Sequence, residues 1–582
     1  MSTLDTPDEV DLLVLGGGVA GLATALVAAI EGLSVLVCEK SSQFGGTAAT
    51  SAGTVWVPGS RQAEAAGLAD PVEWARAYLA AEIDESGGGA DTVGQRLRAT
   101  YLATGPRVLD YLEQHSHVHF TPAVRHPDYH DEHPGAAIGG RALVARPFDG
   151  RRLGADFARL RPPMASMMVL GGMSVAKDDV APLLAPWSSW RAFGHAASLL
   201  LRHARDRLVY PRGTRLVMGN ALIARLMLSL RERGVPLMSG VHAMRLHRAA
   251  GGRVEAATIA HAGGTRVVRA RRGVVLACGG FAHGTAWRRQ WLPQAANEAH
   301  TPSLMFEGNT GDGLDLATAV GAVARADGHA TPAFWVPTSA WTECSGGQRS
   351  WFPHFALDRA KPGLIAVNAA GRRFVNEADS YHDFVLGMYR SHRSVPTLPA
   401  WLVCDAVFVR RYGLGRIRPG GWGLAAAVRR GDVLSAPTLA QLAAGMHVDA
   451  AGLADSVARN NRFAASGVDE DFGRGRRELN RFNGDSRQRP NPCLGPIGRA
   501  PFYAVAVWPA DAGMSAGLVT DANARVLDAH GDAVEGLYAC GADMASIMRG
   551  RYPGPGVTLG PALVFGWRAA MHAAGRAAPP AR

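Results

Sequence analysis

Apolar residues in this 582-residue chain form short runs that are separated by helical patterns. The first run, Val10 to Leu15, is followed by apolar positions at helical spacing, and a second run covers Ser34 to Cys38. This order predicts a strand, a helix and a second strand. Further runs predict strands at 273–281 and 536–541, and a last helix from about Gly560. Such alternation is typical of an α/β fold.

The turn between the first strand and its helix carries a glycine motif. Gly16, Gly18 and Gly21 have the spacing GxGxxG. The first glycine permits a tight turn, the second allows the backbone to approach a pyrophosphate, and the third allows the helix to pack close to the strand. Glu39 follows the second strand at the offset of an acidic residue that binds ribose hydroxyls. The motif therefore predicts a dinucleotide site.

A second loop of glycines and small residues comes directly afterwards, with Gly45, Gly46, Thr47, Ser51 and Gly53 as its candidate contacts. A nicotinamide dinucleotide does not need such a loop. In a flavin, the ribityl chain and the three-ring head extend past the pyrophosphate, and small residues let the ring lie against backbone. We therefore predict that the cofactor is FAD rather than NAD.

Two later strands return the chain to this site, one ending in the glycine pair at 279–280 and the other at Gly541. The dinucleotide domain is therefore expected to be discontinuous in sequence. We predict an α/β, Rossmann-like FAD-binding domain made of residues 1–300 and 500–582, with an inserted α+β catalytic domain at residues 301–499.

The net charge of +11 suggests nucleic acid or an anionic membrane as a partner. Only three lysines occur, and the arginines are scattered without basic runs interleaved with aromatic residues, so we expect no nucleic-acid partner. The chain has no run of about 18 apolar residues, so we expect no membrane-spanning helix. Residues 187–210 have a basic amphipathic pattern, for which a packed surface helix is favoured and peripheral membrane contact stays possible.

Cysteine and histidine positions indicate neither disulfides nor a metal. The six cysteines form no CxxC pair, and Cys38, Cys278 and Cys540 lie in apolar runs. Reduced thiols, together with an N-terminus that lacks signal-peptide features, predict a cytoplasmic protein. A strand at His115–His119 would place three imidazoles on one face, with three more histidines by residue 133, but this spacing matches no familiar zinc framework. We therefore expect no metal.

A rigid turn lies near the C-terminus, where Tyr552 to Gly556 reads YPGPG ahead of a helix. The two prolines restrict the backbone and leave the Gly556 N–H able to donate. The Tyr552 hydroxyl and the Gly556 N–H can then serve as two donors to one carbonyl oxygen. A plain Pro-Gly turn ahead of a helix is the alternative.

On these motifs, the sequence resembles the FAD-dependent 3-ketosteroid dehydrogenases, the Δ1 type most closely, within the fumarate reductase flavoprotein group. The resemblance covers nearly the whole chain. The segments that carry it are the first glycine motif with Glu39 and Lys40, then residues 45–56, 127–129, 219–222, 309–312, 371–377 with Tyr381, 467–471, 517–521 and 552–556.

The resemblance implies removal of two hydrogens across the C1–C2 bond of a 3-ketosteroid or a similar hydrophobic ketone. Tyr552 and Gly556 would bind the C3 carbonyl oxygen, and Tyr381 would remove the C2 proton. Tyr129 would hydrogen-bond to Tyr381 and favour its phenolate, flavin N5 would take the hydride from C1, and an external acceptor would then take the electrons. A Δ4(5α)-dehydrogenase and a fumarate reductase-like alkene reductase are the alternatives.

Further cofactor contacts are expected from residues outside the two glycine loops, namely Lys40, Val241, Gly279, Gly280, Asp312, Gly541, Asp543, Gly556 and Leu559. The chain departs from the resemblance at Ala542, where the family usually has Asn, and Asp543 is the neighbouring candidate for that contact. Phe334, Trp335 and Trp56 are candidates for the apolar walls of a steroid site, with core packing as the alternative.

Overall fold

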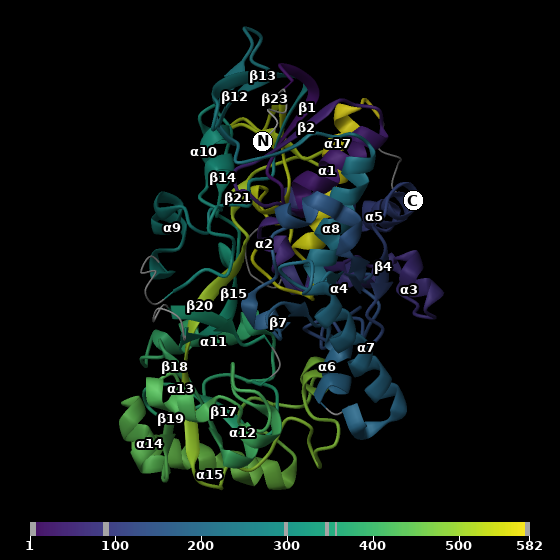
Figure 1. Cartoon of the computed structure of the whole chain (residues 1–582). Coiled ribbons are helices and arrows are strands. Elements are labelled where there is room, and N and C mark those ends of the chain that lie inside the picture. Colours follow the sequence, from purple (N-terminus) through teal and green to yellow (C-terminus); the bar gives the residue numbers. More distant parts are fainter. Residues whose placement is uncertain are drawn as a thin grey trace.

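Two large sheets organise the molecule, one in the upper and one in the lower part of Figure 1. The computed structural model describes residues 7–84, 92–184, 186–295, 301–343, 349–355 and 358–576. The α/β fold predicted from the sequence is confirmed.

The upper sheet has the order β10-β2-β1-β13-β12-β11, and β23 pairs with both β13 and β22. Its strands are β1 (Glu9–Leu15), β2 (Val35–Glu39), β10 (Leu237–Ser239), β11 (His242–Arg248), β12 (Val254–His261), β13 (Gly264–Leu276), β22 (Arg525–Leu527) and β23 (Ala533–Ala539). β1 pairs in parallel with β2 and with the end of β13, and its last four residues are buried. The strands predicted from the apolar runs are confirmed, with ends that differ by a few residues.

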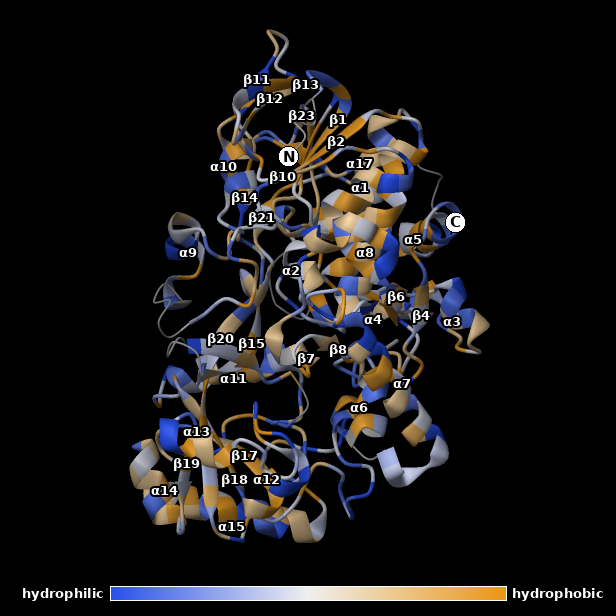
Figure 2. Ribbon diagram, in the orientation of Figure 1, coloured by the Kyte–Doolittle hydropathy of each residue, from blue (hydrophilic) through white to orange (hydrophobic). Residues whose placement is uncertain are grey.

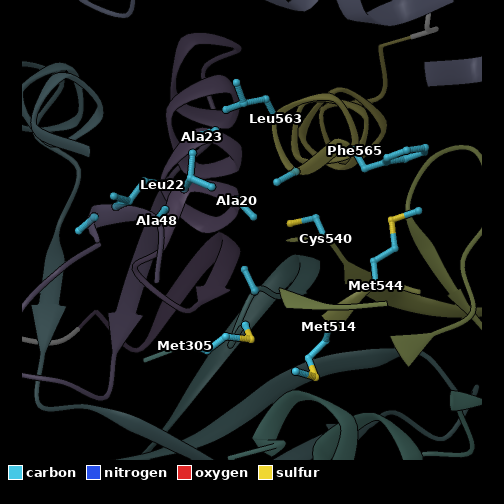
Figure 3. Close-up of a cluster of buried hydrophobic side chains, with 14 of the residues drawn as sticks. Ala20, Leu22, Ala23, Ala48, Met305, Met514, Cys540, Met544, Leu563 and Phe565 are labelled. Atoms are coloured by element: carbon cyan, nitrogen blue, oxygen red, sulfur yellow. The ribbon is translucent and has the colours of Figure 1, made fainter. Parts of the chain in front are cut away.

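Three helices pack together beside this sheet: α1 (Val19–Ile30), α8 (Met218–Glu232) and α17 (Leu559–Ala573). Figure 3 shows α1 and α17 side by side, with Ala20 and Ala23 of α1 on the side that faces Leu563 of α17. Gly21 allows α1 to pack closely against the glycine turn that precedes it, because a Cβ there would lie 2.0 Å from the Gly16 carbonyl oxygen. Figure 2 shows hydrophobic colour concentrated on β1, β2 and these helices, which form the core of the upper part.

The lower sheet is antiparallel, with the order β16-β15-β20-β18-β17 and β19 paired to β20. Its strands are β15 (Ala333–Thr342), β16 (Arg349–Pro353), β17 (Leu364–Val367), β18 (Ala400–Asp405), β19 (Leu434–Ala436) and β20 (Phe502–Met514). Because β20 pairs only within this sheet, the chain returns to the upper part after Met514 and not at residue 500. The division into three sequence segments otherwise stays a prediction.

Most helices in the second half of the chain belong to the lower part of the molecule. They are α9 (Thr285–Trp291), α11 (Tyr381–His392), α12 (Ala406–Tyr412), α13 (Leu424–Arg430), α14 (Leu439–Met446), α15 (Ala450–Ser466) and α16 (Glu478–Asn483). The helix α10 (Asp312–Thr318) instead packs against β11 of the upper sheet. The remaining helices are α2 (Gly46–Ala49), α3 (Arg61–Ala65), α4 (Val72–Asp84), α5 (Thr92–His115), α6 (Lys177–Leu184), α7 (Trp190–Asp206) and the short 3-10 segments η1 (Gly150–Arg159), η2 (Ala165–Met167), η3 (Pro186–Ser188), η4 (Pro293–Ala295) and η5 (Gly541–Asp543).

Short strands complete the fold: β3 (Thr54–Trp56), β4 (Phe120–Pro122), β5 (Ala142–Ala145), β6 (Phe148–Asp149), β7 (Met168–Val169), β8 (Met173–Ser174), β9 (Arg215–Leu216), β14 (Ala324–Arg325) and β21 (Gly517–Leu518). The strand expected at His115–His119 is wrong, because α5 continues to His115 and β4 begins only at Phe120. Among the described helices, none combines the length and the apolar character that a membrane crossing needs.

Candidate active site

A cavity of about 1410 Å³ reaches from the ends of β1 and β2 to β15 and β20 of the lower sheet. The glycine turns line one part of it, which we call the nucleotide end and define by Gly16, Gly18, Glu39 and Gly46. The second part, the tyrosine end, is defined by the tyrosines at 129, 381 and 552 together with Gly556.

Glycines shape the nucleotide end through their lack of a side chain. Gly16 has a φ of +115°, and a Cβ there would lie 2.0 Å from the Ala277 carbonyl oxygen. A Cβ on Gly18 would instead meet nothing within 4 Å, and Gly18 lines the cavity. The open space beside Gly18 lies at the N-terminus of α1, where backbone N–H groups favour an anion. This arrangement fits a pyrophosphate.

The second glycine loop folds into the short helix α2 beside this space. Gly45 and Gly46 have φ values of +122° and +46°, and a Cβ on Gly53 would lie 2.3 Å from the Gly219 backbone nitrogen. The loop therefore brings its backbone against α8 and leaves Thr47 and Ser51 at the cavity wall.

Acidic residues at the nucleotide end are held by well-defined partners. The Glu39 carboxylate accepts from the Gly17 N–H at 2.7 Å and from the Ser41 N–H at 2.8 Å, and burial raises its pKa. Lys40 Nζ lies 2.7 Å from the Asp312 carboxylate. These contacts fix the cavity wall on the side where a ribose is expected.

Most of the predicted cofactor contacts line the cavity: Gly16, Gly18, Glu39, Lys40, Gly46, Thr47, Ser51, Gly53, Val241, Gly279, Asp312, Gly541, Gly556 and Leu559. Gly21, Gly45 and Gly280 lie behind its surface, where they permit close backbone packing.

Asp543 has a different place from the one predicted for it. Its buried carboxylate accepts from the backbone N–H groups of Cys278 and Gly280, and it does not line the cavity. Burial raises the pKa of Asp543 to about 6. Asp543 therefore shapes the glycine turn at 279–280, and the neighbouring Ala542 is the residue at the wall.

Three tyrosines from distant segments meet at the tyrosine end. The Tyr129 ring centroid lies 5.9 Å from that of Tyr381 and 5.8 Å from that of Tyr552, and the Tyr381 and Tyr552 rings are 5.3 Å apart. The Tyr129 hydroxyl donates to the Tyr381 oxygen over a long 3.5 Å contact. Gly556 lines the same part of the cavity, and its N–H has no acceptor among the described residues.

Burial raises the pKa of all three phenols well above the ordinary value of tyrosine. The neutral phenol is therefore the favoured form of each. Tyr129 adds to the rise in the pKa of Tyr381 through its charge and hydrogen bond, whereas the hydrogen bond with Tyr552 lowers that pKa. The expectation that Tyr129 favours a Tyr381 phenolate stays a prediction, which rests on the direction of the Tyr129 donor.

Hydrogen bonds to the backbone hold the segments of Tyr129 and Tyr552 in place next to each other. The Tyr129 N–H and the Tyr78 hydroxyl both donate to the Pro553 carbonyl oxygen, at 2.8 and 2.6 Å. A Cβ on Gly556, whose φ is +97°, would lie 2.6 Å from the Thr54 carbonyl oxygen. The YPGPG turn is thus packed against β3 on one side and against the Tyr129 loop on the other.

A buried ion network behind the tyrosines was not anticipated from the sequence. His130 Nδ1 lies 2.7 Å from Glu82, and His130 Nε2 lies 2.9 Å from Asp383, two residues after Tyr381. The two carboxylates raise the pKa of His130 well above its usual value despite its burial. His130 therefore links the Tyr129 loop to α11.

One histidine group among the described residues has the proximity that a shared metal would need: Glu82, His130 and His133. His130 already has a carboxylate beside each ring nitrogen, and ion pairing accounts for this contact. The spacing of the histidines gave no sign of this group, because Glu82 lies 48 residues before His130 on α4.

The apolar walls differ from those predicted. Phe334 lines the cavity and lies edge-on to Tyr552, with ring centroids 5.2 Å apart. Trp56 and Trp335 are fully buried and do not line it, since their indole N–H groups donate to Asp128 and Thr331 inside the core. Core packing is the correct interpretation of these two tryptophans.

Comparisons with known proteins agree over nearly the whole chain. The family described as FAD binding domain matches residues 11–559. The 4-oxocyclohex-2-ene-1-carboxylate 5-dehydrogenase of Sinomonas cyclohexanicum is 37% identical, over 97% of this chain and 93% of that protein. The 3-oxosteroid 1-dehydrogenase of Mycobacterium tuberculosis is 36% identical, over 98% of this chain and 99% of that protein.

Among solved structures, one is similar over its full length. It is the 3-ketosteroid Δ1-dehydrogenase of Sterolibacterium denitrificans in complex with 1,4-androstadiene-3,17-dione, with a TM-score of 0.88 and 36% identity. The match covers 98% of this chain and 100% of that structure.

Proposed function

Because this chain belongs to the FAD binding domain family and is an FAD-dependent oxidoreductase, we propose that it catalyses the 1,2-desaturation of a 3-ketosteroid. The convergence of Tyr129, Tyr381, Tyr552 and Gly556 in one cavity is the observation that supports this reaction most directly. Relatives that act on 3-oxosteroids and on oxocyclohexene rings share the chemistry of a cyclic ketone.

The ketone oxygen is bound by the Tyr552 hydroxyl and the Gly556 N–H. Both donors lie at the cavity wall, and the Gly556 N–H needs an acceptor. Negative charge grows on this oxygen as the proton leaves C2, and donors in a water-poor site stabilise that charge. The same interaction makes the C2 proton more acidic.

Tyr381 accepts the C2 proton as its phenolate, after its own proton has passed to solvent, and Tyr129 donates to the Tyr381 oxygen. Only the phenolate can take this proton, and burial makes the phenolate of Tyr381 costly to form, so proton removal also depends on the acidity that Tyr552 and Gly556 impose on C2. The Tyr129 donor lowers the cost of negative charge on the Tyr381 phenolate.

The cofactor is held by the nucleotide end. The space beside Gly18 receives the pyrophosphate, Glu39 faces the adenosine ribose, and Lys40 with Asp312 closes that side. Thr47, Ser51, Gly53, Val241, Gly279, Gly541 and Leu559 complete the contacts proposed along the cofactor. When bound, FAD supplies the acceptor for the hydride that leaves C1.

The test is anaerobic mixing of the purified flavoprotein with a panel of ketones and fumarate. We expect 4-androstene-3,17-dione to bleach the flavin absorbance and to yield the 1,4-diene, and fumarate to leave dithionite-reduced enzyme reduced. Formation of a 4-ene from a saturated 3-ketosteroid, or reoxidation by fumarate, would instead assign the chain to one of the alternative activities.

We also propose an external electron acceptor. Desaturation leaves two electrons on the enzyme, so turnover requires a partner that removes them. With a limiting amount of enzyme and no oxygen, steroid oxidation should stop after one equivalent and should continue when phenazine methosulfate is added. Continued anaerobic turnover without that dye would contradict this proposal.

A peripheral contact with a membrane surface is proposed for α7 and the segment before it. Trp187 and Trp190 are 85% and 90% exposed, and Leu201 is 71% exposed, whereas Leu199 on the other face is buried. Arg191, Arg205 and Arg207 are exposed on the same segment. Leu200 of α7 also lines the cavity, so a membrane bound here would lie beside a route for an apolar substrate.

Sedimentation with vesicles of phosphatidylcholine and phosphatidylglycerol tests this contact. We expect Trp190→Ser combined with Leu201→Ser to reduce cosedimentation severalfold. Trp422→Ser, at an exposed tryptophan far along the chain in the lower part, is the matched control and should bind like the wild type. Equal binding by both variants would rule out α7 as the contact.

A cytoplasmic location is proposed from the thiols. Cys38, Cys278, Cys404, Cys493 and Cys540 are free, while Cys344 lies outside the described residues. Alkylation in intact and lysed cells, followed by mass spectrometry, should find these thiols reduced in the cytosolic fraction.

A further inference from the structure

Beyond the tyrosines, the cavity continues along aromatic side chains toward the lower part of the molecule. His126 lies next to Tyr129, with ring centroids 6.5 Å apart, and stacks on Phe482 at 4.8 Å. Phe482 belongs to α16, and both rings line the cavity. A continuous series of ring contacts along the cavity wall therefore leads from Tyr552 through Tyr129 and His126 to Phe482.

The wall at this far end is rich in positive charge. Lys361, Arg411, Arg418 and Arg487 all line it, against the two acids Asp379 and Asp485. We call these four cations and the loop 483–487 the distal wall.

The two acids already have partners. Asp485 accepts from Arg411 at 2.8 Å, from the Tyr412 hydroxyl at 2.8 Å and from the Arg487 backbone N–H at 3.0 Å. Asp379 lies 3.5 Å from Arg477 and accepts from Asn480. Asp485 also lies 3.4 Å from Arg487 Nε, and its charge acts on Lys361 without direct contact, so one carboxylate is shared among several cations.

Lys361 and Arg418 lack a carboxylate partner among the described residues. Lys361 is only partly exposed, and its Nζ donates to the Gly484 carbonyl oxygen at 2.7 Å. Removal of an ammonium group from water is costly unless an anion compensates. Burial accordingly lowers the pKa of Lys361. Lys361 faces the substrate cavity, and an anionic ligand best explains an ammonium group at this position.

We propose that the preferred substrate is a 3-ketosteroid that carries a carboxylate at the end opposite its ketone, and that Lys361 and Arg418 bind this carboxylate. The proposal rests on the proposed function, because Tyr552 and Gly556 must hold the ketone at the other end. The run of rings from Tyr129 through His126 to Phe482 suits the flat apolar body of several fused rings. A carboxylate accepts charge-assisted hydrogen bonds from both cations.

Steady-state kinetics with a matched pair of substrates tests this assignment. The pair is 3-oxo-4-androstene-17β-carboxylic acid and its methyl ester, which differ in the charge and by one methyl group. We expect kcat/KM to favour the acid by about tenfold or more, as for one charge-assisted hydrogen bond. The preference should shrink as salt is raised.

Variants separate the distal wall from the tyrosine end. Lys361→Met and Arg418→Gln should raise KM for the acid severalfold and leave the ester unchanged, and Lys361→Arg should restore the preference. Arg410→Gln, at an exposed arginine beside Arg411 that does not line the cavity, is the control and should match the wild type.

Three outcomes would overturn the proposal. Equal kcat/KM for acid and ester would refute the carboxylate site and leave the proposed function standing. Faster turnover of 4-oxocyclohexanecarboxylate than of either steroid would refute the fused-ring body. Oxidation of no ketone in the panel would refute the proposed function itself.

Discussion

The two ends of the cavity are built from different parts of the chain. The nucleotide end is formed largely by backbone, with Gly16, Gly18 and Gly46 in one stretch of about 30 residues. The tyrosine end is formed by side chains from residues 129, 381 and 552, which only the packed fold brings together. Single substitutions should therefore act through backbone strain at one end and through lost polar groups at the other.

The largest effect is expected at the ion network that positions two of the tyrosines. His130→Gln leaves the buried Glu82 carboxylate and the half-buried Asp383 carboxylate without their shared cation. Such a loss costs about 3–5 kcal/mol. Denaturant unfolding of the holoenzyme should show this decrease, and His117→Gln, at a half-exposed histidine paired with Glu232, should change stability by less than about 1 kcal/mol. Equal stability of both variants would show that His130 does not link the tyrosine segments.

Tyr552→Phe removes one donor to the ketone oxygen and should lower turnover by about 10² to 10³-fold, with FAD retained. Tyr389→Phe is the matched control, because this buried hydroxyl on α11 has no hydrogen-bond partner among the described residues and does not line the cavity. Stopped-flow measurement of flavin reduction by the steroid compares the two variants. A wild-type rate for Tyr552→Phe would contradict the assignment of this end.

Gly16→Ala and Gly18→Ala should behave in opposite ways at the nucleotide end. At Gly16, positive φ and the Ala277 carbonyl oxygen predict a loss of about 2–4 kcal/mol in the free energy of unfolding. At Gly18, the added methyl meets open cavity, so the fold should be unaffected while the flavin-to-protein absorbance ratio falls. Full FAD content in Gly18→Ala would place the pyrophosphate elsewhere.

The smallest effect is a pH dependence of stability. Glu82 and Asp383 raise the pKa of His130 in the folded state above its unfolded value, so this contribution is fully present below about pH 6.5 and is lost as pH rises through the folded value. The loss is smaller than in His130→Gln, because neutral imidazole keeps one hydrogen bond. The midpoint of thermal unfolding should fall on the alkaline side in the wild type and change less in His130→Gln. Parallel pH profiles would exclude His130 as the cause.

Local features were predictable because they depend on a few consecutive residues. The strand, glycine turn and helix at Val10 to Ala29 need only apolar spacing and the dihedral freedom of glycine, and the structure has them where the pattern predicts. Phe334 was also expected at the substrate wall, and it lines the cavity.

Features that depend on long-range packing could not be predicted from the sequence. Apolar tryptophans at 56 and 335 were equally good wall candidates until packing placed them in the core. Asp543 was expected at the cofactor because it follows Gly541, but the fold directs its carboxylate to the turn at 279–280. β20 begins just beyond residue 500 but pairs with the lower sheet.

The sequence by itself determined the α/β class, the dinucleotide turn and the choice of FAD, because glycine spacing and apolar periodicity act within a short stretch of chain. Only the tertiary structure decided that Glu82, His130 and Asp383 share a buried charge network, and that Lys361 and Arg418 face the same cavity as the tyrosines. These side chains come from helices and loops far apart in sequence. Their meeting depends on how whole elements pack, and no local pattern carries that information.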